Sequence, residues 1–280
     1  MSDAKNFFRG WAKPGVNVSG TTQPEAGETL DALSGNFRIF QLKDGHRFST
    51  DDLLAAWYGT TWCPSASRVL DLGSGIGSVG LVAAWRLPGA KFVTIEAQQI
   101  SAELAKKSAA YNGVSERYEI RVGDFRDSGL LGDEEKFDLI LGSPPYFPLG
   151  SGVTAEHPQK VACRFEVRGE VADYCRVAAP HLNSGGVFAI VFPIQPEAQL
   201  ARVQNGARAA GLTIVRQRPI ILREGEPPLL GVFVMMCSEH LPENFRVKTW
   251  SEPPLIIRAC DGSVHPEYQA IKLAVGFPPN

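Results

Sequence analysis

Short apolar runs alternate with helical segments along most of the chain, and this alternation constrains the fold more than any other feature. The runs RVLDL and KFVTI are separated by the helical stretch SVGLVAAWRL. Five further strand-like runs follow, at YEIRV, KFDLILG, GGVFAIVFP, LTIVRQRPI and LLGVFVMMC. Strands that alternate with helices form a parallel sheet with helices on both faces. The pattern therefore predicts an α/β fold, doubly wound and Rossmann-like, with a mainly parallel seven-stranded sheet.

The last two of these strands are joined by a loop and not by a helix. Antiparallel neighbours need only a short connection, whereas parallel neighbours need a long crossover. We therefore expect an antiparallel edge strand. After it, the segment EPPLIIRACDGSVHPEYQAI predicts a short strand, a turn at Asp261-Gly262 and a terminal helix.

The chain is expected to have three parts. Residues 1–30 are rich in Gly, Ser, Thr, Asn and Pro, which predicts a flexible N-terminal lead. Residues 31–66 contain FRIFQLKDGHRFSTDDLLAAWYG, which predicts a hairpin that turns at Asp44-Gly45 and then a helix capped by Ser49 or Thr50. Residues 67–280 form the main α/β domain.

Composition excludes several classes of protein. The net charge of −2 gives no overall attraction for nucleic acid, so any such surface must be local. The five cysteines are far apart, and the five histidines lack metal-ligand spacing. No apolar run reaches the length of a membrane span. We therefore expect a cytoplasmic protein with reduced thiols, no bound metal and no membrane partner, and its oligomeric state stays open.

A glycine-rich turn, DLGSGIG, follows the first main strand, where open α/β sheets bind ligands. Gly73, Gly75 and Gly77 let the backbone turn tightly and approach a ligand closely. Glycines also serve ordinary tight turns, so this pattern alone is weak.

Acidic residues make the turn more specific, because they end three successive strands at one edge of the predicted sheet. Glu96 follows the glycines by about 20 residues, where a carboxylate can accept both ribose hydroxyls. Asp124, followed by Phe125, can face an adenine amine. Asp71 precedes the glycines, where it suits a cation and would repel a pyrophosphate. The alternative is a sheet with helix caps and solvated acids. The pattern favours S-adenosylmethionine over a dinucleotide.

The segment SPPYF follows the fourth main strand. Two prolines fix two φ angles and remove two backbone donors, so the segment is rigid. Two acceptors aimed at an exocyclic amine can turn its lone pair towards a methyl donor, and rigid geometry assists in-line attack. Here the Ser143 hydroxyl and the Pro144 carbonyl would be the acceptors, held by Pro145, while Tyr146 or Phe147 stacks on the base. A rigid turn whose aromatic rings pack in the core is the alternative.

Taken together, these motifs resemble the bacterial tRNA adenine-N6 methyltransferases that modify the adenine next to the anticodon in tRNA(Val). The resemblance runs from about Phe37 to Tyr268 and rests on GHRFSTDDLLAAW, DLGSGIG, IE, GD, SPPYF, ACRFE and DGSVHPEY. It implies a class I S-adenosylmethionine-dependent methyltransferase that releases S-adenosylhomocysteine and has RNA, preferably tRNA, as its partner.

The resemblance also implies roles for individual residues. Thr50 and Asp51 would lie near the methionine end of the cofactor, and Arg164 and Glu166 would support the active-site loop. The other implied cofactor-binding residues are Asp71, Gly73, Gly75, Gly77, Glu96, Asp124 and Phe125. The implied catalytic and substrate-binding residues are Ser143, Pro144, Pro145, Tyr146, Phe147 and Arg164.

One position departs from the family pattern, which has Asn where this chain has Ser143. Ser-Pro-Pro-Tyr is more often seen in enzymes that methylate the cytosine exocyclic amine, so cytosine N4 stays an alternative target. A protein glutamine amide is a second alternative, and a methyltransferase fold that binds without turnover is a third.

An arginine-rich stretch between Ala201 and Arg223 contains no Asp or Glu and is a candidate RNA surface. Solvated arginines on a helix face and strand ends are the alternative. The arginines are Arg202, Arg208, Arg216, Arg218 and Arg223.

Overall fold

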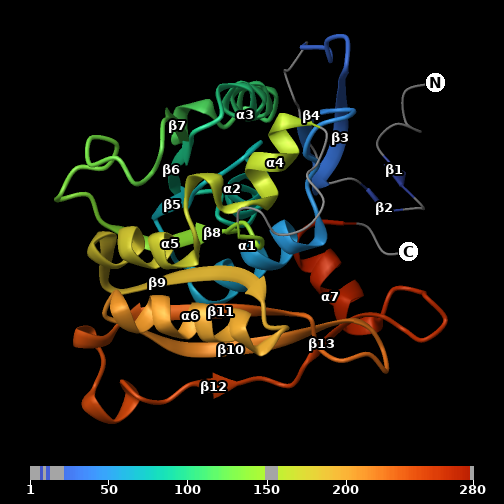
Figure 1. Ribbon diagram of the computed structural model, residues 1–280. Coiled ribbons are helices and arrows are strands. Elements are labelled where there is room, and N and C mark those ends of the chain that lie inside the picture. Colours follow the sequence, from blue (N-terminus) through green and yellow to red (C-terminus); the bar gives the residue numbers. More distant parts are fainter. Residues whose placement is uncertain (1–6, 9–10, 13–21, 149–156, 278–280) are drawn as a thin grey trace.

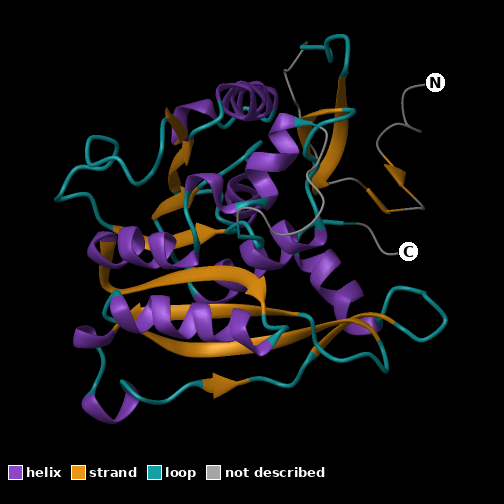
Figure 2. Cartoon of the chain, in the orientation of Figure 1, coloured by secondary structure: helices purple, strands orange, loops and turns teal. Residues whose placement is uncertain are grey.

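The computed structural model describes residues 7–8, 11–12, 22–148 and 157–277, without the side chains of residues 7–8, 11–12, 162 and 164. A central sheet separates two layers of helices (Figures 1 and 2). The sheet contains nine strands in the order β12-β10-β11-β9-β8-β5-β6-β7, with β13 beside β10. They are β5 (Arg68–Leu72), β6 (Lys91–Glu96), β7 (Tyr118–Val122), β8 (Phe137–Gly142), β9 (Leu182–Pro193), β10 (Leu212–Arg223), β11 (Leu230–Cys237), β12 (Trp250–Ser251) and β13 (Leu255–Arg258).

The predicted doubly wound fold with seven main strands is confirmed by β5 to β11. Strands β5 to β9 pair in parallel, so their carboxyl ends meet at one edge. The antiparallel strand is β11, which lies between β9 and β10. The sheet continues beyond β10 through the short strands β12 and β13, which pair with it in parallel.

Helices cover both faces of this sheet. They are α1 (Thr50–Trp62), α2 (Ser78–Arg86), α3 (Gln99–Tyr111), α4 (Pro158–Arg164), α5 (Val171–Ala178), α6 (Glu197–Ala209) and α7 (Pro266–Ala274). One apolar core joins α1, α2, α3 and α7 to one face, and a second core joins α5 and α6 to the other. Short 3-10 turns lie at Ser115–Arg117, Glu166–Arg168, Ala179–His181, Ser238–His240 and Glu243–Phe245.

The N-terminal hairpin differs from the prediction. It consists of β3 (Glu28–Ser34) and β4 (Phe37–Leu42) and turns at Gly35, so the expected turn at Asp44-Gly45 is wrong. A Cβ atom at Gly45 would lie 2.1 Å from Oε1 of Gln159. The glycine therefore permits close packing after the hairpin. The strand also begins at Glu28, inside the segment expected to be flexible. A second pair, β1 (Phe7–Phe8) and β2 (Trp11–Ala12), precedes it.

Side chains of α3 and the residue after it fasten the hairpin to the main domain. Asn112 accepts a hydrogen bond from Arg38 N at 2.8 Å and donates one to Arg38 O at 2.7 Å. The Ser108 hydroxyl accepts from Phe40 N at 2.9 Å. These bonds satisfy backbone groups on the outer edge of β4, which would otherwise be unpaired.

Replacing Asn112 with Ala should lower the free energy of unfolding by roughly 2 kcal/mol, because two backbone groups of Arg38 lose their partners. Urea denaturation measures this change. Asn205→Ala, on the exposed face of α6, is the matched control and should change stability by less than about 0.5 kcal/mol. Equal effects of the two variants would contradict a fastening role for Asn112.

Candidate active site

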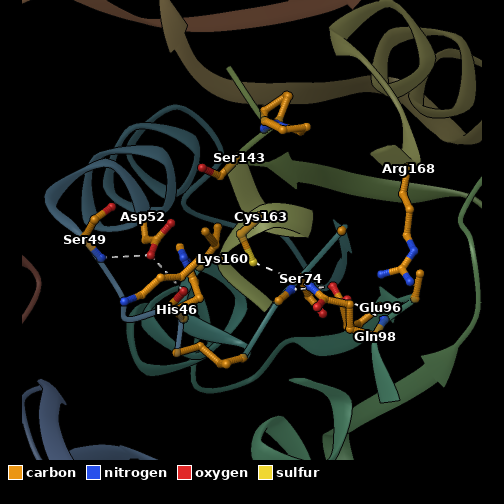
Figure 3. Close-up of a pocket in the computed structure, with 18 of the residues that line it drawn as sticks. His46, Ser49, Asp52, Ser74, Glu96, Gln98, Ser143, Lys160, Cys163 and Arg168 are labelled. Atoms are coloured by element: carbon orange, nitrogen blue, oxygen red, sulfur yellow. Dashed lines mark hydrogen bonds between the residues drawn. The ribbon is translucent and has the colours of Figure 1, made fainter. Parts of the chain in front are cut away.

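A cavity of about 560 Å³ opens at the carboxyl ends of the parallel strands. This volume is within the range of small-molecule sites. The loop before α1, the glycine turn, the ends of β6 and β7, the SPPYF segment and α4 all contribute to its wall. Figure 3 shows Glu96 and Gln98 on one side, Ser49 and Asp52 on the other, and Lys160 and Cys163 of α4 between them.

The glycine turn adopts a backbone that favours glycine. The φ angles of Gly73, Gly75 and Gly77 are 62°, 56° and 86°. A Cβ atom at Gly73 would lie 2.3 Å from the Tyr174 hydroxyl, whereas one at Gly75 would have no neighbour within 4 Å. Gly73 and Gly75 line the cavity, and Gly77 is the N-cap of α2. The turn therefore brings bare backbone to the cavity wall.

Glu96 lies at the end of β6 and lines the cavity with only 6% of its surface exposed. Its carboxylate accepts hydrogen bonds from Gly75 N at 2.8 Å and from Gln98 N at 2.6 Å. Burial raises the pKa of this carboxyl. The two backbone donors hold the side chain in a fixed orientation beside the turn.

Asp124 and Phe125 also line the cavity, at the end of β7. Hydrogen bonds from the Arg126 side chain to Asp124, at 2.6 and 2.9 Å, lower the pKa of that carboxyl. The Phe125 ring packs against Tyr174, with ring centroids 4.5 Å apart. Both residues therefore line the cavity, and the contact of Asp124 with an adenine amine stays a prediction.

Asp71 is fully buried beneath the glycine turn and is not among the residues that line the cavity. Its Oδ2 accepts a hydrogen bond from Gly80 N at 2.9 Å, and its Oδ1 has no partner among the described residues. Burial raises the pKa of this carboxyl well above its usual range. Asp71 therefore ties β5 to α2 and places a carboxyl group under the turn.

The SPPYF segment is fixed at Tyr146 by three elements. The Tyr146 hydroxyl donates a hydrogen bond of 2.6 Å to Asp51 of α1. The Tyr146 carbonyl accepts one of 3.1 Å from the side-chain amide of Gln199 in α6. The Tyr146 ring meets Phe192 of β9 edge to face, with centroids 5.7 Å apart. Because hydroxyl and ring are both engaged, Tyr146 is less free to stack on a base than expected.

The neighbouring Phe147 is 47% exposed and lies at the cavity wall. Its carbonyl accepts a hydrogen bond of 3.0 Å from Glu166 N, and the Glu166 carboxylate pairs with Arg202. Glu166 thus contacts the active-site loop through its backbone. The side chain of Arg164 lies outside the described part of the structure.

Thr50 is placed differently from the sequence-based expectation. It is not among the residues that line the cavity, and its side chain acts to lower the pKa of Tyr268 of α7, which burial raises. Asp71 and Gly77 likewise lie outside the lining of the cavity, Asp71 bonded to Gly80 N of α2 and Gly77 as the N-cap of that helix. A direct cofactor contact by these three residues stays a prediction.

The cavity also contains residues that sequence reasoning missed. Asp52 is buried at the third position of α1 and accepts hydrogen bonds of 3.0 Å from Ser49 N and from the Ser78 hydroxyl. An acid in a first helical turn is an ordinary capping feature, so its sequence position hid its place in the cavity. The other unpredicted lining residues include Ser74, Gln98, Lys160, Cys163, Arg168 and Tyr174.

The arginine-rich stretch does not form the expected surface at the cavity. Arg202 pairs with Glu166 and Glu170, and Arg218 pairs with Glu267. Arg216 lies over the Trp62 ring at 3.5 Å. Arg208 and Arg223 are not among the cavity-lining residues either. Three of the five arginines are thus engaged by other side chains of the protein.

Two kinds of feature are absent from the described residues. No group of three His, Cys, Asp or Glu side chains has the arrangement of a metal site. None of the helices in this part of the chain is both long and apolar enough to span a membrane.

Comparison with known proteins identifies the class. Residues 52–201 match the family model of the methyltransferase small domain. The structure is similar to that of a predicted O-methyltransferase from Agrobacterium tumefaciens, with a TM-score of 0.60 and 19% identity over 82% of this chain and 99% of that one. At this identity the likeness concerns the fold alone. The chain is therefore a methyltransferase with a Rossmann-like fold.

Curated relatives identify the family within this class. The tRNA1(Val) (adenine(37)-N6)-methyltransferase of Porphyromonas gingivalis is 35% identical over 83% of this chain and 89% of that protein. The enzyme of the same name from Shewanella frigidimarina is 27% identical over 79% of this chain and 87% of that protein. The chain belongs to the tRNA1(Val) (adenine(37)-N6)-methyltransferase family, which confirms the resemblance inferred from its motifs.

The buried position of Asp71 predicts a specific pH dependence of stability. Folding raises the pKa of Asp71 above its unfolded value, which is about 3.9. Its contribution is thus fully present below about pH 3.9 and is lost as pH rises through the folded pKa. Asp71→Asn should raise the urea midpoint at pH 7.5, because it removes a buried charge and keeps an acceptor for Gly80 N.

The difference between Asp71→Asn and the unsubstituted protein should shrink as pH falls towards 4. Asp133→Asn, at an exposed loop position, is the control and should leave the midpoint unchanged at both pH values. A lower midpoint for Asp71→Asn at every pH would contradict the buried-charge argument.

Proposed function

We propose that this protein transfers a methyl group from S-adenosylmethionine to the exocyclic N6 of an adenine in tRNA. One observation carries the proposal: the SPPYF segment lines the same cavity as the glycine turn and Glu96. This shared cavity supports an acceptor pair for an amine next to a site suited to a nucleoside. The curated relatives support the choice of adenine in tRNA.

The chemistry of the cavity fits this cofactor. Ser74 Oγ is buried at the cavity wall without a partner among the described residues, and the space beside Gly75 is open. Glu96 can accept ribose hydroxyls, and the carboxyl groups of Asp51 and Asp52 favour a positively charged ligand. When bound, the cofactor supplies an electrophilic methyl group. Asp71 does not line the cavity, and in this proposal it contributes a carboxyl group buried under the glycine turn.

The residues of the SPPYF segment have separate roles in this proposal. The Ser143 hydroxyl and the Pro144 carbonyl accept the two hydrogens of the substrate amine, and Pro145 keeps their spacing rigid. Phe147, which is exposed at the cavity wall, stacks on the extruded base. The amine proton leaves to water after transfer, so no general base is required.

Basic side chains at the cavity support an RNA partner. They come from the loop before α1, from α4 and from the 3-10 turn after it, and together they offer phosphate contacts that the net charge does not. These residues are Lys43, His46, Arg47, Lys160 and Arg168. A cytoplasmic location follows from a tRNA substrate and is part of this proposal.

The test uses the purified full chain with methyl-tritiated S-adenosylmethionine and bulk tRNA, followed by digestion to nucleosides. We expect label in N6-methyladenosine, and strong loss of label in Ser143→Ala. Label in N4-methylcytosine would replace adenine with the cytosine alternative, and label in protein would favour the glutamine amide. Cofactor binding with no labelled product would contradict the proposed activity.

Glu96 supplies a separate prediction about the cofactor. Glu96→Gln keeps one acceptor oxygen and should weaken cofactor binding roughly 10-fold, since charge-assisted hydrogen bonds are about twice as strong as neutral ones. Calorimetry with S-adenosylhomocysteine measures this change without turnover. Glu103→Gln on α3 is the control, because Glu103 is exposed and contacts Gln99 instead of the cavity. Equal affinity of both variants would exclude Glu96 from the ribose site.

A further inference from the structure

The backbone of Phe147 is held on both sides by hydrogen bonds from other elements. The carbonyl before it, that of Tyr146, accepts a bond of 3.1 Å from the side-chain amide of Gln199 in α6. Its own carbonyl accepts a bond of 3.0 Å from Glu166 N. Peptide groups are planar, so only the φ and ψ angles of Phe147 can turn between these two carbonyls. Holding both carbonyls therefore fixes the direction in which the Phe147 side chain leaves the backbone.

Arg202 of α6 contacts both of the residues that supply these bonds. Its Nη1 donates a hydrogen bond of 2.9 Å to Oε1 of Gln199. Its Nη2 donates to the Glu166 carboxylate and, at 3.2 Å, to Oε2 of Glu170. A guanidinium can only donate, so it selects the oxygen of the Gln199 amide. The amide nitrogen is then left to donate to the Tyr146 carbonyl.

The contacts of Arg202 are partly buried, which distinguishes them from an ordinary surface ion pair. The side chains of Arg202 and Glu166 are 23% and 11% exposed. The guanidinium also lies 5.6 Å from the centroid of the Phe192 ring, which meets the Tyr146 ring edge to face. Exposed ion pairs contribute little, but partly buried charges are screened less by salt. Arg202 can therefore hold Gln199 and Glu166 in place.

The prolines of the SPPYF segment do not by themselves position Phe147. Pro144 and Pro145 fix their own φ angles and restrict the residue before each, whereas Phe147 comes after them. The Phe147 ring is exposed at the cavity wall, with its centroid 6.0 Å from that of the Phe165 ring. An exposed ring on a fixed backbone is a suitable stacking surface for a base.

We propose that Arg202 is a positioning residue that fixes the backbone of Phe147 through Gln199 and Glu166, so that the Phe147 ring is preset for the substrate base. This inference rests on the proposed function and extends it to a residue that does not line the cavity. The sequence pattern placed Arg202 in a candidate RNA surface, whereas its contacts within the protein give it this different role.

The test compares Arg202→Met and Arg202→Lys in the purified full chain with S-adenosylmethionine and tRNA. Methionine cannot donate, so kcat for tRNA methylation should fall roughly 10- to 100-fold, as for a misplaced substrate contact. Lysine keeps the charge but lacks the planar fork that reaches both partners, so it should recover less than about threefold of this loss. The Kd for S-adenosylhomocysteine should stay within about twofold in both variants.

Direct contact of Arg202 with a tRNA phosphate would give a different result. Lysine would then largely replace arginine, and Arg202→Met would raise KM and reduce the salt dependence of tRNA binding by about one phosphate contact, with kcat unchanged. That outcome overturns the inference. Arg208→Met is the matched control on the same helix and should change neither kcat nor KM, because Arg208 bonds to Asn205 within α6.

Substitution of Phe147 tests whether its ring is what Arg202 positions. With Phe147→Ala there is no ring to direct, so adding Arg202→Met should cost less than about threefold. Gln199→Leu removes one of the two held carbonyl contacts and should reproduce part of the loss seen in Arg202→Met. An equal cost of Arg202→Met with and without the Phe147 ring would overturn the inference.

Hydrogen exchange reports the same contacts without turnover. The Glu166 N–H that donates to Phe147 should exchange faster in Arg202→Met than in the unsubstituted protein or in Arg208→Met, while urea midpoints report the folding of every variant. Unchanged exchange at Glu166 overturns the inference and leaves the proposed function intact. If the unsubstituted protein labels no RNA, the proposed function fails, and the positioning role falls with it.

Discussion

Four carboxyl groups crowd the carboxyl edge of the sheet, and the rest of the site depends on how they are held there. Asp52, Asp71 and Glu96 are buried, and Asp51 is partly buried. Each accepts hydrogen bonds from uncharged donors such as Gly75 N, Gly80 N and the Tyr146 hydroxyl. Burial without paired cations raises the pKa of all four. Such an edge costs stability in the free protein and favours a positively charged ligand.

Much of this arrangement could be predicted from the sequence because it depends on local patterns. The strands β5 to β11 are apolar runs with clear boundaries. The glycines of DLGSGIG have positive φ angles, which glycine adopts more readily than other residues. Parallel strands meet at one edge, so Asp71, Glu96 and Asp124 could be expected together without knowledge of any contact. The loop between β10 and β11 indicated an antiparallel pair. It could not indicate that β11 lies between β9 and β10, because pairing partners are a tertiary choice.

Other features were hidden because distant packing determines them. Asp44-Gly45 has the composition of a hairpin turn, but Gly45 is small to make room for Gln159, more than a hundred residues away. Helix α4 is only seven residues long and begins after His157, which is not a common N-cap. The arginines between Arg202 and Arg223 have the composition of an RNA-binding surface, but Arg202, Arg216 and Arg218 contact side chains of the protein itself. In each case the sequence gives the residue type but not its partner.

The segment SPPYF illustrates both sides of this limit. Its prolines indicate rigidity from sequence alone, yet its orientation depends on Asp51, which is 95 positions away from Tyr146. An amide side chain at position 143 would always present an acceptor, because its oxygen only accepts hydrogen bonds and its nitrogen only donates them. A hydroxyl there can both donate and accept a hydrogen bond, so its part in the reaction depends on the groups around it. The orientation of the SPPYF segment is therefore a property of the α1 end of the cavity as much as of the segment itself.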